Sequence, residues 1–173
     1  LITVGKISNR KGQLNVLKSL PRIIKKYPTV HYHMVGIPDE LNKLALSEDY
    51  YQIKRYYTIH GILSDRKMFE LMDQSDIFLM LSNHTNDGDF EGFGIAIIEA
   101  NILGLPAIGS EGCGISDAII HGETGYLINP ENTSELIISI DKIINNYNQF
   151  SKNSIQRAYQ LSWDMVIKKY IRA

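Results

Sequence analysis

The sequence predicts an α/β fold in which a parallel sheet is covered by helices on both faces. Short apolar runs recur along the chain, with amphipathic segments between them. Most of the runs end at a glycine or a small polar residue, where a parallel strand would continue into a loop. Such an alternation of strands and helices favours a parallel sheet whose ligand binds at the carboxyl ends of the strands.

Six apolar runs are predicted to be strands, and three of the intervening segments have helical spacing. The strands are expected within residues 1–7, 30–37, 56–62, 77–82, 105–110 and 125–129. The helical spacings join Leu17, Leu20, Ile24 and Tyr27, then Phe69, Leu71 and Met72, and then Leu136, Ile140, Ile143, Ile144 and Tyr147.

Two further features concern the helices at the ends of the chain. Pro21 removes one backbone donor from the first helical segment, so we expect a kink or a late helix start there. Ser162 is a suitable N-cap for a terminal helix. The apolar face of that helix would consist of Trp163, Val166, Ile167 and Tyr170.

Composition restricts the class of protein. The 173 residues suit one domain with a sizeable core, and a formal net charge of -1 offers no general field that would attract nucleic acid. The single cysteine, Cys113, cannot form an internal disulfide or a CxxC metal site, which fits a reducing compartment. No apolar run approaches the roughly 20 residues of a membrane span. We therefore expect a single domain over residues 1–173 and a cytoplasmic location.

The chain begins at Leu1, inside a predicted strand and without an initiating methionine, and we expect no signal peptide. We expect it to be a piece of a longer protein, cut at a domain boundary.

The first candidate site is the basic loop VGKISNRKG at residues 4–12. It carries Lys6, Arg10 and Lys11 between two glycines, and no acidic residue occurs in the first 38 positions. Close backbone approach at the glycines and the positive end of a following helix suit a phosphate or diphosphate. The Walker and GxGxxG patterns are both absent. A solvated basic turn is the alternative interpretation.

The second candidate is DFEGFGIAIIEA at residues 89–100, which places Glu91 and Glu99 eight positions apart. On helical geometry the two would lie about 12 Å apart, too far for one small group to satisfy both. A sugar nucleotide would suit them, because it has hydroxyls on either side of a negatively charged diphosphate. The helix amides expected to face that diphosphate belong to Phe93, Gly94 and Ile95.

Alternatively, Glu91 is a charge at a helix start and Glu99 a surface residue. The apolar residues around Glu99 argue against the second of these interpretations. An unpaired buried carboxylate would cost several kcal/mol, so we expect Glu99 to hold a ligand.

The third candidate is the glycine-rich segment at residues 109–130. Its glycines mark tight loops at the ends of two strands, consistent with another wall of the same crevice, although turn chemistry alone explains most of it. We interpret Cys113 as a small filler between two glycines, because the sequence places no base beside it.

Taken in this order, the segments resemble the C-terminal, donor-binding half of retaining GT-B glycosyltransferases, in the family called group 1 or family 4. The resemblance covers nearly the whole chain. It runs through VGKISNRKG, VGIPDE, IHGILSDRKMFELMDQSDIFLMLS, GDFEGFGIAIIEANILGLPAIGS and HGETGYLINP. It ends at the predicted terminal helix, which begins with Ser162 and Trp163. It implies a Rossmann-like parallel sheet flanked by helices, which forms one half of a GT-B architecture, with the N-terminal acceptor domain absent from this chain.

The resemblance also implies roles for individual residues. Lys11 matches the lysine that binds the donor diphosphate, whereas Lys6 stands where arginine is common, so a bidentate contact would be lost. Glu91 matches the carboxylate that meets the donor sugar, and Glu99 the one that meets the ribose hydroxyls. The nucleotide base of the donor is expected to lie against the backbone after His60 and Gly61, near Ile62 and Leu63. The full set of expected donor contacts beyond the catalytic Lys6, Lys11 and Glu91 is Gly5, Ile62, Leu63, Phe93, Gly94, Ile95 and Glu99.

One loop departs from the commonest form of the family. NHTNDGDFEG is longer, and it is similar to a subset with Gly-Asp before the first glutamate, some of whose members mannosylate lipid acceptors. His84, Asp87 and Asp89 in this loop could suggest a metal cluster. Because the family generally needs no metal, we interpret them as a polar loop and predict neither a metal nor another cofactor.

The implied function is that of a glycosyltransferase fragment. The chain would bind a UDP-, GDP- or ADP-sugar, and Lys6, Lys11 and the helix amides would stabilise the leaving diphosphate. The longer protein, a hexosyltransferase of polysaccharide biosynthesis, would transfer the sugar with retention to a glycan or lipid-linked acceptor, in the cytoplasm or at the inner face of the membrane. The fragment alone should be inactive, because the acceptor domain is missing.

Two alternatives stay open: a GT-B sugar-nucleotide epimerase and a non-catalytic nucleotide-binding module. The sequence does not distinguish the base, donor sugar, acceptor, linkage or oligomeric state.

Overall fold

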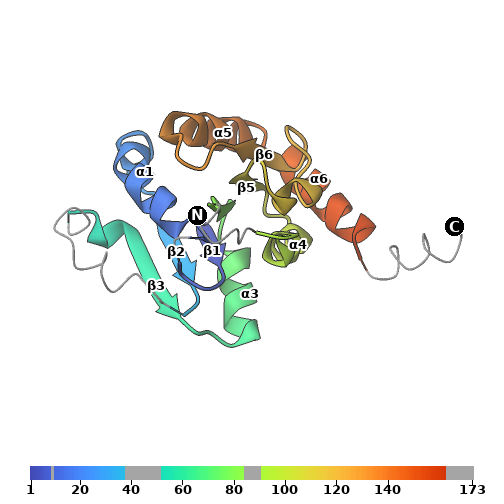
Figure 1. Ribbon diagram of the computed structural model, residues 1–173, viewed down its shortest axis with the longest axis horizontal. Helices are drawn as coiled ribbons and strands as arrows, with labels where there is room; N and C mark the ends of the chain where they lie inside the picture. Colours follow the sequence, from blue (N-terminus) through green and yellow to red (C-terminus); the bar gives the residue numbers. More distant parts are fainter. Residues whose placement is uncertain (9, 38–51, 84–90, 163–173) are drawn as a thin grey trace, which may run out of the picture.

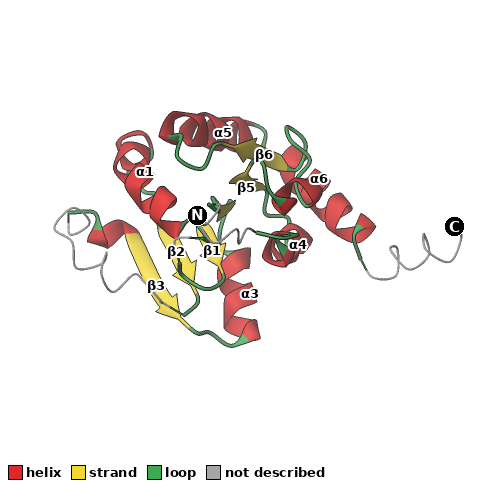
Figure 2. Ribbon diagram, in the orientation of Figure 1, coloured by secondary structure: helices red, strands yellow, loops and turns green. Residues whose placement is uncertain are grey.

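The structure is a computed structural model that describes residues 1–8, 10–37, 52–83 and 91–162. In this part of the chain, six strands form one parallel sheet in the order β3-β2-β1-β4-β5-β6, as the sequence predicts (Figure 2). Every strand lies inside its predicted apolar run. The strands are β1 (Ile2–Val4), β2 (Tyr32–Val35), β3 (Tyr57–Gly61), β4 (Phe78–Met80), β5 (Ala107–Ser110) and β6 (Gly125–Ile128).

Helices cover both faces of this sheet, so the predicted Rossmann-like α/β fold is confirmed (Figure 1). The α-helices are α1 (Gln13–Lys26), α3 (Asp65–Asp73), α4 (Ile95–Ile102), α5 (Thr133–Asn145) and α6 (Tyr147–Gln160), and the short 3-10 helices are η2 (Lys54–Tyr56) and η3 (Gly114–Asp117). Among these helices, none is long and apolar enough to cross a membrane.

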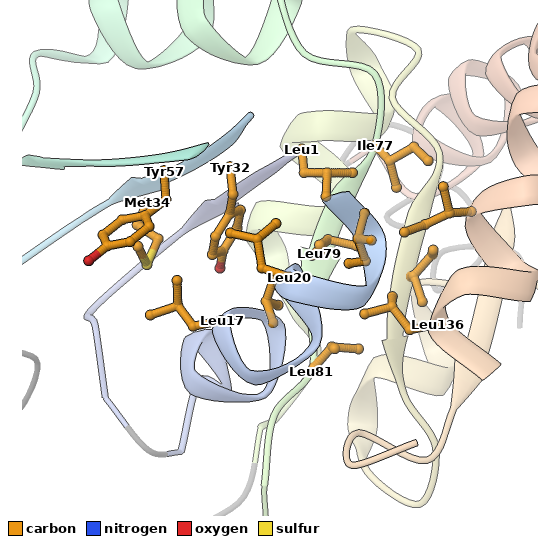
Figure 3. Packing of buried hydrophobic residues seen from close by; sticks show 14 of the residues in the cluster. Leu1, Leu17, Leu20, Tyr32, Met34, Tyr57, Ile77, Leu79, Leu81 and Leu136 are labelled. Carbon is orange, nitrogen blue, oxygen red and sulfur yellow. The ribbon is translucent and has the colours of Figure 1, made fainter. Parts of the chain in front are cut away.

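The two faces of the sheet have separate hydrophobic cores. Along β4, Leu79 belongs to the core under α1 and α5, whereas Phe78 and Met80 belong to the core under α3 and α4. This alternation follows from the two-residue period of a strand. In Figure 3, Leu17 and Leu20 of α1 lie over the first of these faces.

The direction in which the sheet grows reverses between β1 and β4. β1 pairs with β2 on one side and with β4 on the other, and the chain builds β2 and β3 before it returns to β4. In open α/β sheets, ligands bind outside the carboxyl ends of the strands at such a point. The loops after β1 and β4 are therefore the first place to look for a site.

Two expectations about the helices are wrong. The late helix start expected at Pro21 is wrong, because α1 begins at Gln13 and continues through Pro21 to Lys26, and the alternative of a kink stays a prediction. Pro21 costs one backbone hydrogen bond, and the complete burial of Leu20 and Ile23 on either side offsets that loss.

The second wrong expectation joined Tyr147 to the helix that contains Leu136. α5 ends at Asn145, and Tyr147 begins a separate helix, α6. The buried residues of α6 are Phe150, Ser154 and Ala158, a stripe too weakly apolar to be recognised as a helix face. The predicted helix after Ser162 lies outside the described residues.

Candidate functional site

The loop between β1 and α1 is held against the carboxyl end of β4. Gly12 has φ 72°, and a Cβ at this position would lie 1.6 Å from the carbonyl oxygen of Leu81. The amide of Asn83 donates to the carbonyl oxygen of Arg10 at 2.9 Å, and Nδ2 of Asn15 donates to the carbonyl oxygen of Leu81 at 3.0 Å. Only glycine fits at position 12, and the backbone next to it is fixed.

The segment that enters α4 is held in the same way by the loop after β5. The amide of Gly114 donates to the carbonyl oxygen of Glu91 at 3.1 Å. A Cβ on Gly114 would lie 2.1 Å from the carbonyl oxygen of Gly92, so the two loops touch through their backbones. Gly94 then begins α4 from a left-handed conformation, with φ 73°.

Three charged side chains meet where these loops converge. Oε2 of Glu91 accepts a hydrogen bond from Nη1 of Arg10 at 2.8 Å and lies 2.7 Å from Nζ of Lys11. The carboxylate is nearly buried, with 9% of its side chain exposed, against 15% for Lys11 and 27% for Arg10. A buried carboxylate requires such partners, and two cations around one anion leave a net positive charge.

The N-terminus of α4 adds further positive potential next to this cluster. The amides of Phe93, Gly94 and Ile95 have no acceptor among the described residues, and no side chain caps the helix. At this end of the helix, Phe93 and Ile95 are 40% and 70% exposed, whereas Gly94 between them is buried.

The surroundings of Glu99 differ from those expected. The turn of α4 directs Ile97, Ala100 and Asn101 into the core, whereas Glu99 is half-buried on the outer face. Neighbouring apolar letters in a sequence do not bury a helical residue, because each residue is rotated by about 100° from the last. The argument from a buried, unpaired Glu99 carboxylate is therefore wrong.

Glu99 borders a long apolar groove between α4 and α6. The groove has a volume of about 850 Å³. It is lined by Phe93, Ile95, Ile98, Glu99, Ile102, Ile155, Ala158, Tyr159, Leu161 and Ser162. Glu99 has no hydrogen-bond or ion-pair partner among the described residues, so its carboxylate is available to a ligand.

The two glutamates also do not share one helix. Glu91 lies four residues before the first residue of α4, in the approach to it, and Glu99 lies on its second turn. The distance of about 12 Å expected for two helical positions therefore does not apply to them.

The remaining predicted residues lie at the same edge of the sheet, at different distances from the cluster. The side chain of Lys11 lies against Gly5, since its Cε is 3.5 Å from the position of a Cβ on Gly5. Lys6 follows and is exposed. Ile62, which is 77% exposed, and Leu63 follow β3, two strands away from β1. The structure brings Gly5, Lys11 and Glu91 together, and Gly94 follows Glu91 by three residues, while Ile62 and Leu63 lie two strands away.

Arg10 is the residue of this site for which the sequence predicts no separate role. In the sequence it is one of three basic residues in a loop, with Lys6 and Lys11, and the structure places its guanidinium on Glu91. Its position next to Lys11 is the only signal that the sequence contains.

Cys113 has the character of a packing residue. It is half-buried against the core under α3 and α4, and its Sγ donates to the carbonyl oxygen of Ser110 at 3.6 Å. Burial raises the pKa of the Cys113 thiol, and the negative charge of Glu91 raises it further. A raised pKa disfavours the thiolate that a nucleophile needs.

No group of three or more His, Cys, Asp and Glu side chains within the described ranges could hold a metal ion. The loop that contains His84, Asp87 and Asp89 lies outside those ranges.

Comparisons with known proteins identify the family to which this chain belongs. The family model of glycosyl transferases group 1 matches residues 1–161. The amylovoran biosynthesis glycosyltransferase AmsK of Erwinia amylovora is 29% identical over 141 residues, which are 81% of this chain and 34% of AmsK. The putative colanic acid biosynthesis glycosyltransferase WcaL of Salmonella typhimurium is 25% identical over 79% of this chain and 34% of WcaL. The chain thus spans about a third of the length of these relatives.

The fold is also similar to that of solved GT-B enzymes. The crystal structure of the pneumococcal O-GlcNAc transferase GtfA in complex with UDP and GlcNAc superposes with a TM-score of 0.79 at 21% identity, over 99% of this chain and 34% of GtfA. This likeness concerns the fold, and the family match covers nearly all of the sequence. The chain belongs to the group 1 glycosyl transferases, and its fold is one half of a GT-B architecture.

Proposed function

We propose that this chain binds a nucleoside-diphosphate sugar at the carboxyl ends of β1 and β4, as the donor half of a glycosyltransferase. The observation that carries the proposal is the cluster of Arg10, Lys11 and Glu91, which lies where the sheet reverses its growth and beside the N-terminus of α4. Cations and free helix amides at one point are suited to a diphosphate.

The chemistry proposed for this site is stabilisation of the leaving diphosphate. Bond breaking at the anomeric carbon moves negative charge onto the diphosphate, and fixed positive groups favour that change. We assign this role to Lys11, Lys6 and the amides of residues 93–95. We assign Glu99 to the ribose hydroxyls and Glu91 to the donor sugar. Ile62 and Leu63, at the end of β3, are assigned to the base.

The acceptor is proposed to be a glycan or a lipid-linked sugar, and the transfer is proposed to retain the anomeric configuration. AmsK and WcaL are named for the biosynthesis of amylovoran and colanic acid, which supports a role in making a polysaccharide. The acceptor site is assigned to an N-terminal domain of the longer protein, located in the cytoplasm or at the inner face of the membrane. No metal or other cofactor is assigned a role.

Calorimetric titration of the chain with UDP, GDP and ADP, and with their hexose derivatives, tests this function. One base should bind in the micromolar to millimolar range, and both Lys11→Ala and Glu99→Ala should weaken that binding about tenfold or more, a loss of about 1.4 kcal/mol each. Lys18→Ala is the matched control, because Lys18 is an exposed lysine on α1 outside the site. Absence of binding for every nucleotide, or equal losses in all three variants, would contradict the proposal.

A further inference from the structure

We propose that Glu91 is an internal competitor of the donor: it occupies Arg10 and Lys11 in the free domain, and the donor diphosphate displaces it from both cations. This inference rests on the proposed function and adds to it an exchange of ionic partners and a diphosphate-binding role for Arg10.

The contacts of the cluster favour such an exchange. Both cations contact the same carboxylate oxygen, Oε2 of Glu91, at 2.8 Å from Arg10 and 2.7 Å from Lys11. A diphosphate has more negative charge and more acceptor oxygens than one carboxylate, so it can pair each cation separately. The carboxylate and the diphosphate cannot share the cations at no cost, since like charges in a poorly hydrated site repel.

Arg10 can change partners without any change in the fold. Its carbonyl oxygen is fixed by the amide of Asn83 at 2.9 Å, while its side chain is the most exposed of the three in the cluster, at 27%. A guanidinium offers two parallel donors to a phosphate, which a lysine does not. Arg10 therefore supplies the bidentate contact that Lys6 cannot make.

The exchange also changes which groups the carboxylate of Glu91 can bind. While it is paired to two cations, its Oε2 accepts from them and not from a ligand hydroxyl. Once the diphosphate has taken the cations, the carboxylate becomes a free acceptor within the same site. Binding of the diphosphate thus prepares Glu91 for the sugar that follows it in the donor.

Calorimetric dissociation constants for UDP, GDP and ADP test the competition, because these ligands carry the diphosphate and no sugar. Glu91→Gln keeps the size of the side chain and removes its charge, so it should tighten binding of the preferred nucleotide about tenfold. Arg10→Ala should weaken the same binding, and Arg10→Lys should restore part of it. The matching nucleoside, which lacks phosphate, should bind all variants alike.

Two controls separate the loss of competition by Glu91 from a general change in charge and from misfolding of a variant. Glu111→Gln removes a carboxylate from an exposed position after β5, and it should change the dissociation constant much less than Glu91→Gln. Amide spectra of each variant show whether it is folded, and Arg10→Ala provides an independent test should Glu91→Gln fail to fold.

The outcomes distinguish the inference from the proposed function. Nucleotide binding that Glu91→Gln leaves unchanged or weakens, or that Arg10→Ala leaves unchanged, overturns the competition and leaves donor binding in place. Binding of no nucleotide by the wild type or by Glu91→Gln overturns both.

Discussion

Glu91 and Glu99 carry the same functional group in different surroundings. Glu91 is 7% exposed and bound to two cations, whereas Glu99 lies half-buried on the outer face of α4 beside an apolar groove. Removing both cations from Glu91 would leave a buried charge without a partner, which is costly. Removing a neighbour of Glu99 would not leave a buried, unpaired charge. The two carboxylates are therefore suited to different tasks in one site.

Cys113 offers a way to follow the charge of Glu91. Burial is the main reason that the pKa of Cys113 is raised, and Glu91 adds to it. In Glu91→Gln the thiol pKa should fall, so more thiolate forms at a given pH and iodoacetamide reacts faster. The chain has one cysteine, so mass spectrometry of the alkylated protein reports this thiol alone. Glu123→Gln, an exposed carboxylate, is the control, and equal rate profiles for wild type and Glu91→Gln would contradict the prediction.

At the scale of single residues, the sequence predicts which loops carry the candidate residues better than it predicts the contacts of those residues. Gly5, Lys11, Glu91 and Gly94 all follow from motifs, because loops after strands and glycines before helices can be recognised locally. The pairing of Glu91 with Arg10 joins residues 81 positions apart, and no local pattern specifies it.

Among the elements, the loop from β1 to α1 depends most on a single position. Gly12 combines φ 72° with close contact to the carbonyl oxygen of Leu81. Gly122 has φ 80°, and a Cβ added there would have no atom within 4 Å, so it serves as the matched control. Gly122→Ala should cost about 1 kcal/mol of unfolding free energy from its backbone alone. Gly12→Ala should cost more, because the Leu81 backbone must also move.

Urea unfolding of both glycine variants measures this difference. Equal losses of unfolding free energy would show that the contact with Leu81 does not constrain the loop. Gly12→Ala should also weaken nucleotide binding, since the loop carries Arg10 and Lys11.

A cluster of histidines consists of His33 on β2, His60 on β3 and His31 directly before β2. Nδ1 of His33 lies 3.0 Å from Nε2 of His60, and the rings of His31 and His33 have centroids 4.7 Å apart. Burial is the main cause that lowers the pKa of His33 to about 4, together with the charges of His31, the amino terminus and His60. The unfolded chain therefore binds a proton at His33 near pH 6.5, where the folded protein does not.

This shift predicts how stability depends on pH. The contribution of His33 is fully present above about pH 6.5 and is lost as the pH falls toward 4. His33→Gln should therefore reduce the slope of unfolding free energy against pH in that window. Urea unfolding at a series of pH values measures the slope, with His121→Gln as the control. An unchanged slope in His33→Gln would contradict the prediction.

The elements themselves follow from the sequence to different degrees. All six strands are predicted, because buried parallel strands are continuous apolar runs that nothing else in the chain imitates. α6 is missed, because it buries Ser154 and Ala158 against its neighbours and only one large apolar residue, Phe150. Gly104 shows how closely α6 approaches α4, since a Cβ there would lie 2.6 Å from Oγ of Ser151.

On the scale of the whole molecule, the chain corresponds to about a third of the length of AmsK and WcaL. We expect no sugar transfer when the chain alone is incubated with UDP-, GDP- or ADP-hexoses and candidate acceptors, because the acceptor site is assigned to the remainder of the longer protein. Detection of a transfer product by mass spectrometry would contradict the assignment of the acceptor site to the remainder of the longer protein. Isomerisation of a sugar nucleotide by the longer protein without an acceptor would instead indicate an epimerase.

The central claim is that a nucleotide donor binds at the carboxyl ends of β1 and β4. Amide chemical shifts of the protein during titration with UDP, GDP and ADP test it most directly. The account predicts saturable shifts for one nucleotide within residues 5–12, 62–63 and 91–99, with little change at the opposite edge of the sheet, around residues 29–31 and 121–123. Shifts concentrated at that opposite edge, or no saturable shifts with any of the three at millimolar concentration, would contradict it.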